Sequence, residues 1–272
     1  MNLTWRVGLY CLVGGLFFTA SALRAGHFWL WWLSGVITVA SLAPVVRFGP
    51  RSWWALFGSV ALAMVVVGLV CTLSEGVLFF PQMKNEVVRD LAGGTVAYLI
   101  VAALLAALAK LLRLAKTPGE VVEHRAVGIA IPMVLLAGLS YVLYYQVFGV
   151  IAFDLYTKQF YPQAVAIVGK LGAWFWVYQW ARGTLMVLAV LPVIYTLRLP
   201  RRQAALAVGV LVWIVGGGAA LLVPNAAMVP AQRYAHILEI MTQNVSLGVT
   251  AVWLLRRKGA TAVAPHATAA AA

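Results

Sequence analysis

The sequence predicts an all-α integral membrane protein, a bundle of about eight transmembrane helices with both termini in the cytoplasm. Of its 272 residues, 64% are hydrophobic and only 10% are charged, whereas about a quarter of the residues in a soluble domain are charged. Long uncharged segments recur along the whole chain, and each can span roughly 30 Å of hydrocarbon as a helix. These two observations predict the class of fold. A third, the concentration of Lys and Arg in alternate connections, predicts its orientation.

Charged residues and clusters of Pro, Gly and Asn separate the spanning segments from one another. The segments are expected at about residues 5–24, 28–46, 53–79, 91–112, 126–153, 171–198, 203–223 and 231–255. Together they form a single polytopic domain, residues 1–258. Residues 259–272 are rich in Ala and Thr and show no charge pattern or periodicity, so we expect a disordered cytoplasmic tail there.

Aromatic residues and turn signals mark the ends of the segments in chain order. Trp5 and Arg6 open the first segment, which also fits a cleavable secretory signal because small residues follow its apolar run. We expect it to be retained as a helix, since it fits the charge pattern. Aromatic residues typical of a membrane interface mark later boundaries, at 28–32, 53–54, 79–80 and 174–176. Pro224 and Pro230 bracket a tight turn between the last two segments.

The distribution of basic residues predicts which loops lie inside. With a cytoplasmic amino terminus, thirteen fall inside, at positions 6, 47, 51, 110, 113, 116, 125, 198, 201, 202, 256, 257 and 258. Six fall outside, at positions 24, 84, 89, 158, 170 and 233, and Arg182 lies within a segment. This excess favours both termini in the cytoplasm, and we expect the membrane to be a bacterial cytoplasmic (inner) membrane. The outer loops 80–90 and 154–170 are expected to hold short helices that act as a lid.

The basic composition does not indicate nucleic-acid binding. The net charge is +13, but the basic residues lie in short loops and form no patch with interleaved aromatic residues. Cys11 and Cys71 lie within apolar segments and belong to no metal-binding spacing. The chain contains no Walker loop, GxSxG, HExxH or dinucleotide fingerprint. We therefore expect no metal and no cofactor, and the expected partners are membrane lipids and a small-molecule or lipid ligand.

The most polar stretch within the apolar chain opens the last segment. Arg233, His236, Glu239 and Gln243 recur on one helical face, and Asn244 follows them. Counted from the outer end at 1.5 Å per residue, His236 lies about 8 Å, Glu239 about 12 Å and Gln243 about 18 Å along the helix. His236 and Glu239 are the candidate catalytic residues, because an imidazole and a carboxylate can both transfer a proton.

Other polar residues are expected in the same half of the membrane. They are Gln179 and Arg182 in the sixth segment, Glu75 in the third, and Tyr144 and Tyr145 in the fifth. A charged side chain in lipid costs at least about 2.5 kcal/mol on insertion scales, so these groups should face the interior and form pairs. We expect Arg182 to pair with Glu239, and Arg233 to pair with Glu75.

This polar cluster has three alternative interpretations. In the leading one, the protein binds or transports a small or amphiphilic anionic solute through a pocket open to the outer face. Arg182 and Arg233 bind the anionic group, and His236 or Glu239 carries a proton. The second is an intramembrane enzyme that acts on a lipid-linked substrate, with His236 as the base. The third is a non-catalytic accessory subunit whose cluster is structural. A metal site of His236, Glu239 and Glu75 is disfavoured because it lacks a second histidine.

Overall fold

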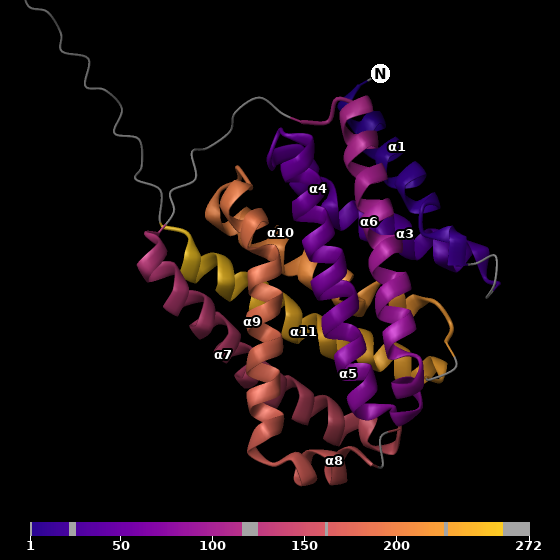
Figure 1. The fold of residues 1–272 in the computed structure, drawn as a ribbon, viewed down its shortest axis with the longest axis vertical. Helices are drawn as coiled ribbons and strands as arrows, with labels where there is room; N and C mark the ends of the chain where they lie inside the picture. The colour runs from indigo at the N-terminus through magenta and orange to yellow at the C-terminus, as the bar shows by residue number, and fades with distance from the viewer. Residues whose placement is uncertain (1, 22–25, 116–124, 161–162, 226–227, 258–272) are drawn as a thin grey trace, which may run out of the picture.

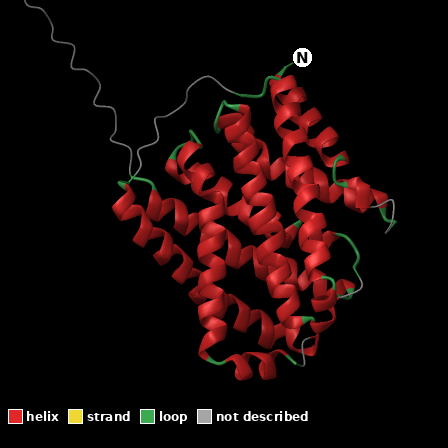
Figure 2. Ribbon diagram, in the orientation of Figure 1, coloured by secondary structure: helices red, strands yellow, loops and turns green. Residues whose placement is uncertain are grey.

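The computed structural model describes residues 2–21, 26–115, 125–160, 163–225 and 228–257. Within these ranges the chain is helical and contains no β-strand (Figure 2). The all-α prediction is therefore confirmed, and its cause is the composition, since an uncharged segment in lipid must pair its backbone groups internally. The tail expected at 259–272 lies outside the described residues.

Six helical spans among the described residues are long and apolar enough to cross a membrane. They are Phe28–Phe48 (α3), Trp53–Phe79 (α4, η2 and α5), Val87–Leu111 (α6), Val127–Phe160 (α7, η4 and η5), Ala173–Thr196 (α9) and Pro230–Leu255 (α11). They correspond to the second to sixth and the eighth expected segments. The protein is therefore a multi-pass membrane protein.

The first and seventh expected segments form shorter helices. The first is α1 (Leu3–Leu16), followed by the 3₁₀ turn η1 (Thr19–Ser21), and the seventh begins with α10 (Arg201–Trp213). After α10 the chain forms η6 (Ile214–Gly218) and η7 (Ala220–Leu222). Gly216 and Gly217 leave the helical conformation there, with a φ of 128° at Gly217, so the expected span 203–223 is broken. Length and composition thus support six crossings among the described residues, fewer than the eight expected.

Short helices occupy both of the long loops that were expected to hold them. They are η3 (Pro81–Asn85) and α8 (Ala164–Leu171). α8 lies at the bottom of Figure 1, opposite the amino terminus, and α5 (Thr72–Phe79) ends beside it. We call this part of the molecule the α8 end. It is the end that the charge pattern assigns to the outer face.

The long helices pack through glycines that lack a side chain at the contact. α11 packs against α10 and α7, α7 packs against α9, and α1 packs against α3. A Cβ added to Gly248 of α11 would lie 2.6 Å from the Cα of Gly209 in α10. A Cβ added to Gly183 of α9 would lie 2.5 Å from the Cβ of Tyr141 in α7. These helices therefore approach each other more closely than any larger side chain allows.

The end opposite α8 is held together by arginines that donate to backbone carbonyls near helix ends. The contacts are Arg47 Nη1 to Leu114 O at 2.7 Å, Arg125 Nε to Leu254 O at 2.6 Å and Arg256 Nη2 to Leu199 O at 3.0 Å. Leu254 lies in the last turn of α11, where carbonyls have no partner within the helix and form the negative end of its dipole, so the Arg125 guanidinium supplies a favourable donor there. Leu114 and Leu199 lie in the connections that follow α6 and precede α10. We call this the basic end.

Candidate functional site

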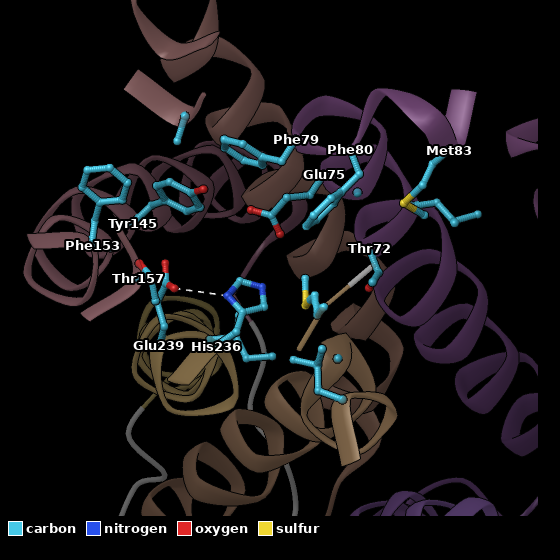
Figure 3. A pocket seen from close by; sticks show the side chains of 18 of the residues that line it. Thr72, Glu75, Phe79, Phe80, Met83, Tyr145, Phe153, Thr157, His236 and Glu239 are labelled. Carbon is cyan, nitrogen blue, oxygen red and sulfur yellow. Dashed lines mark hydrogen bonds and ion pairs between the residues drawn. The ribbon is translucent and has the colours of Figure 1, made fainter. Parts of the chain in front are cut away.

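A cavity of about 1040 Å³ lies at the α8 end of the molecule. Its walls come from α5, α7 (Val127–Ala152), η4 (Phe153–Thr157), α8, α9, η6 and α11, with η3 and the start of α6 at one side. Aromatic side chains supply much of this wall: Phe79, Phe80, Tyr145, Phe153, Phe175 and Trp176. Most of them are labelled in Figure 3, which shows them surrounding the polar groups. The cavity is large enough for a small organic or lipid-like molecule.

The charged groups on the wall are acidic. Glu75, Glu86, Asp90 and Glu239 line the cavity together with His236, and no Lys or Arg among the described residues belongs to the lining. The chain has seven acidic residues, two of which (120 and 123) lie outside the described residues. Four of the five described carboxylates therefore gather around one cavity.

Glu75 is held by the buried arginine of the neighbouring helix. Arg182 Nη2 lies 2.6 Å from Glu75 Oε2, and the Arg182 side chain is only 3% exposed. Arg182 also donates through Nε to the carbonyl of Cys71 at 3.2 Å and through Nη1 to the Tyr141 hydroxyl at 2.8 Å. A weaker contact of 3.5 Å joins Nη1 to Gln179 Oε1. The guanidinium is thus satisfied within the protein, behind the cavity wall.

His236 and Glu239 form a second pair on one turn of α11. His236 Nδ1 lies 3.1 Å from Glu239 Oε2. The dashed line in Figure 3 marks this contact. Gln243, one turn further along, donates through Nε2 to Glu239 Oε1 at 3.3 Å. Gly149 of α7 faces this carboxylate, and a Cβ there would lie 3.5 Å from Glu239 Oε1. The pair leaves His236 Nε2 for a group in the cavity.

This arrangement corrects both predicted ion pairs. Arg182 pairs with Glu75, whereas Glu239 pairs with His236 on its own helix. Arg233 is buried and donates through Nη1 to the carbonyls of Leu221 at 3.2 Å and Leu222 at 3.3 Å. For Arg233, the physical reason is the break at Gly216 and Gly217, because the chain then forms η7, whose carbonyls Arg233 reaches.

The predicted residues separate into three groups. Glu75, Tyr145, His236 and Glu239 line the cavity, and Gln179, Arg182 and Gln243 support these lining residues from behind. Tyr144 bonds Thr250 through its hydroxyl at 2.7 Å, and Asn244 donates through Nδ2 to the Val212 carbonyl at 3.4 Å. Arg233, Tyr144 and Asn244 are therefore not on the cavity wall.

Two lining carboxylates were not predicted as site residues. Glu86 and Asp90 lie where η3 meets α6 (Val87–Leu111), within the loop 80–90 that was expected to form part of a lid. Their spacing of four residues at the start of an apolar run was the available signal, since such a pair lies on one helical face. Arg89 contacts both, with Nη2 at 2.7 Å from Glu86 and 3.3 Å from Asp90.

Helix irregularities converge on the cavity. The π-helical segments η2 (Ala63–Cys71), η4 and η6 each end at or lie in its wall, since Thr72, Phe153 and Gly217 line it. A π segment shifts the backbone register and frees carbonyls for other donors. Arg182 uses the carbonyl of Cys71, the last residue of η2. Such segments are frequent at functional sites.

Within the described residues, no group of three or more His, Cys, Asp or Glu side chains has an arrangement that could hold a metal ion. The residues present are suited to proton transfer and to binding of a positively charged or hydrogen-bonding group.

Comparison of the chain with protein-family models, with curated proteins and with solved structures finds no match.

Proposed function

We propose that this multi-pass membrane protein binds a small amphiphilic ligand in the cavity at its α8 end, and that the head of the ligand is cationic. The observation that carries the proposal is the lining itself, in which four carboxylates and a histidine stand among aromatic side chains, and to which no described Lys or Arg contributes. A cation placed there meets opposite charge at close range in surroundings of low dielectric constant, where attraction is strong.

The charge balance of the lining supports a cationic head. Arg182 neutralises Glu75. The exposed side chain of Arg89 contacts both Glu86 and Asp90, so one positive charge faces two carboxylates. Glu239 is hydrogen-bonded to His236 and Gln243, neither of which carries a permanent positive charge. The lining therefore retains excess negative charge, and aromatic side chains in the same wall, among them Phe79, Phe153 and Trp176, are available for cation–π contact.

The same observation disfavours the anionic solute that the sequence suggested. That interpretation needed Arg182 and Arg233 to face the ligand, but both guanidinium groups are buried against protein partners. An anion in the cavity would face the carboxylates of Glu86, Asp90 and Glu239 without a compensating Lys or Arg on the wall. Like charges at this range repel.

Binding from one side is favoured over passage through the bundle. Toward the basic end, the interior is filled by buried apolar side chains, among them Met64, Val67, Met186, Val190, Leu211 and Leu247. Close-packed side chains of this kind leave no path for a hydrated head group. Binding without transport therefore needs the fewest changes to the described structure.

The proposal is tested with two fluorescent probes that carry the same alkyl chain and differ only in the head, a quaternary ammonium and a sulfonate. Each is titrated by fluorescence anisotropy against the protein in nanodiscs of zwitterionic lipid. The ammonium probe should bind, and Glu239→Gln should weaken it by about tenfold, in line with the value of a charged contact. Asp154→Asn is the matched control, because Asp154 lies beside the cavity in η4 but not on its lining. Tighter binding of the sulfonate probe would refute the proposal.

An intramembrane enzyme is the second candidate, and the geometry of His236 favours it. An imidazole oriented by a carboxylate through Nδ1, with Nε2 facing a cavity, is the arrangement of a general base. The variant His236→Gln separates the two functions in the same preparation. A ligand that binds normally to the variant but is chemically converted only by the unmodified protein would support the enzyme.

A further inference from the structure

A second, smaller hollow of about 270 Å³ lies at the basic end, remote from the α8 end. It is formed where α3 (Phe28–Phe48) ends, α4 (Trp53–Leu62) begins and α6 ends. Its floor is apolar and is made by Val46, Leu56, Ala109 and Leu114. This shape combines an apolar base with a polar entrance.

The charged residues of this hollow are all cations: Arg51, Lys110 and Arg113. All three side chains are exposed. The described carboxylates, Glu75, Glu86, Asp90, Asp154 and Glu239, belong to the α8 end, and no described carboxylate pairs with Lys110 or Arg113. Three cations around one hollow of this size favour a group with several anionic oxygens, such as a phosphate.

The backbone at Arg113 gives a second, independent indication. Leu114 N bonds Ala109 O at 3.1 Å and Arg113 N bonds Lys110 O at 3.0 Å, which is the Schellman ending of a helix. The residue at the centre of this ending has a left-handed conformation and is usually glycine, but here it is Arg113 with a φ of 49°. Glycine adopts this backbone conformation without steric cost, whereas an arginine at position 113 strains the backbone locally.

Neighbouring side chains place the hollow at the level of a membrane interface. Trp53 and Trp54 begin α4 beside it, and Trp54 is 73% exposed. Leu111, between Lys110 and Arg113, is 78% exposed. Trp residues of this kind gather where the acyl chains meet the head groups. Arg47 fixes the inner side of the hollow by its 2.7 Å bond to the carbonyl of Leu114.

We propose that this hollow binds the phosphate of an anionic phospholipid head group, held by Arg51, Lys110 and Arg113. The apolar floor receives the glycerol and the first methylenes of the lipid, a contact that free inorganic phosphate does not need. Basic pockets between transmembrane helices are suited to such head groups.

The test uses the whole protein in nanodiscs of zwitterionic phosphatidylcholine with and without phosphatidylglycerol, and native mass spectrometry counts the lipids that remain bound. The unmodified protein should retain phosphatidylglycerol in preference to phosphatidylcholine. The variant Lys110→Gln with Arg113→Gly should lose about fivefold in this preference for each cation removed. Arg113→Gly also relieves the left-handed backbone, so loss of binding cannot be attributed to a poorer fold. The thermal midpoint of the variant should equal or exceed that of the parent in phosphatidylcholine alone.

The matched control is Arg198→Gln with Arg202→Gln, which removes two exposed cations from the same end of the molecule but not from the hollow. This control should keep the preference. Equal loss in both double variants would show a general effect of positive charge and overturn the proposal. A separate measurement distinguishes a lipid from a free anion. Inorganic phosphate is added to the protein in phosphatidylcholine nanodiscs, and the rise in thermal midpoint is compared with the rise that phosphatidylglycerol causes. An equal rise would identify a free anion as the ligand and contradict the proposal of a lipid.

Discussion

The guanidinium of Arg182 is buried at a depth where a single charge is costly, and Glu75 balances it at 2.6 Å. The backbone carbonyl of Cys71 and the hydroxyl of Tyr141 complete its hydrogen bonds. A buried pair of this kind contributes little net stability compared with an apolar replacement, but the loss of one partner leaves an uncompensated charge. The energetic effect of each residue therefore depends on whether the other is present.

This dependence gives a prediction about Arg182 and Glu75. Glu75→Leu alone should lower the free energy of unfolding by about 3 to 5 kcal/mol, because Arg182 remains buried without a counter-charge. The double variant Arg182→Met with Glu75→Leu should recover most of that loss. The measurement is reversible unfolding in mixed micelles, analysed as a double-mutant cycle.

Glu239 supplies the matched comparison for this cycle. The double variant Arg182→Met with Glu239→Leu should show no recovery, because Glu239 bonds His236 and Gln243 and makes no ion pair with Arg182. If the double variant with Glu239→Leu recovered stability and the double variant with Glu75→Leu did not, Arg182 would pair with Glu239, and the observed pair of Arg182 and Glu75 would be contradicted.

At the scale of helices, close crossings depend on glycine pairs and the cavity depends on interruptions of the helices. The crossing of α10 and α11 brings Gly209 against Gly248, and the crossing of α7 and α9 brings Gly138 and Gly183 together with Tyr141 and Thr184. In lipid no hydrophobic effect drives helices together, so van der Waals contact at such crossings supplies much of the association. Any methyl group inserted there meets backbone atoms that cannot rotate away.

Gly248→Ala should therefore destabilise the bundle by about 1 to 3 kcal/mol or more, the usual effect of overpacking. The new Cβ would lie 2.6 Å from the Cα and 2.7 Å from the N of Gly209. Gly93→Ala in α6 is the control, because no atom lies within 4 Å of a Cβ there. It should leave the thermal midpoint unchanged or raise it slightly, since alanine favours the helix. Equal effects of the two substitutions would contradict the packing described for α10 and α11.

At the scale of the whole molecule, charge is divided between two ends. The described acidic residues lie at the α8 end, and the opposite end carries the arginines that bind backbone carbonyls and the three cations of the smaller hollow. The positive-inside rule then predicts that the basic end faces the cytoplasm and that the cavity opens to the other side. This orientation is a prediction from the chain's charges.

Orientation can be measured by labelling single cysteines in a background that lacks Cys11 and Cys71. Lys170→Cys, at the end of α8, should react with a membrane-impermeant maleimide added outside intact cells. Arg202→Cys, exposed at the basic end, should react only after the membrane is permeabilised. The reverse pattern would place the cavity on the cytoplasmic side, and reaction of both without permeabilisation would contradict a fixed orientation.

The sequence by itself determined the all-α class, the multi-pass character and the positions of six long helices, because runs of apolar residues are a local property of the chain. It also predicted one polar site that includes Glu75, Tyr145, His236 and Glu239, since depth along a helix follows from counting residues. These four residues line one cavity, and their part in binding stays a prediction. Some helix ends differ from the predicted ones because polar residues continue a helix beyond its apolar run. α6, for example, begins at Val87, whereas the predicted segment begins at residue 91.

Only the tertiary structure decided which groups pair and what faces the cavity. Counting along a helix gives depth but not rotation about its axis, and the π segments change that rotation locally. Arg182 therefore meets Glu75 instead of Glu239, and the break at Gly217 takes Arg233 to the carbonyls of η7. The physical result is a cavity whose wall is acidic, although the chain as a whole carries a charge of +13.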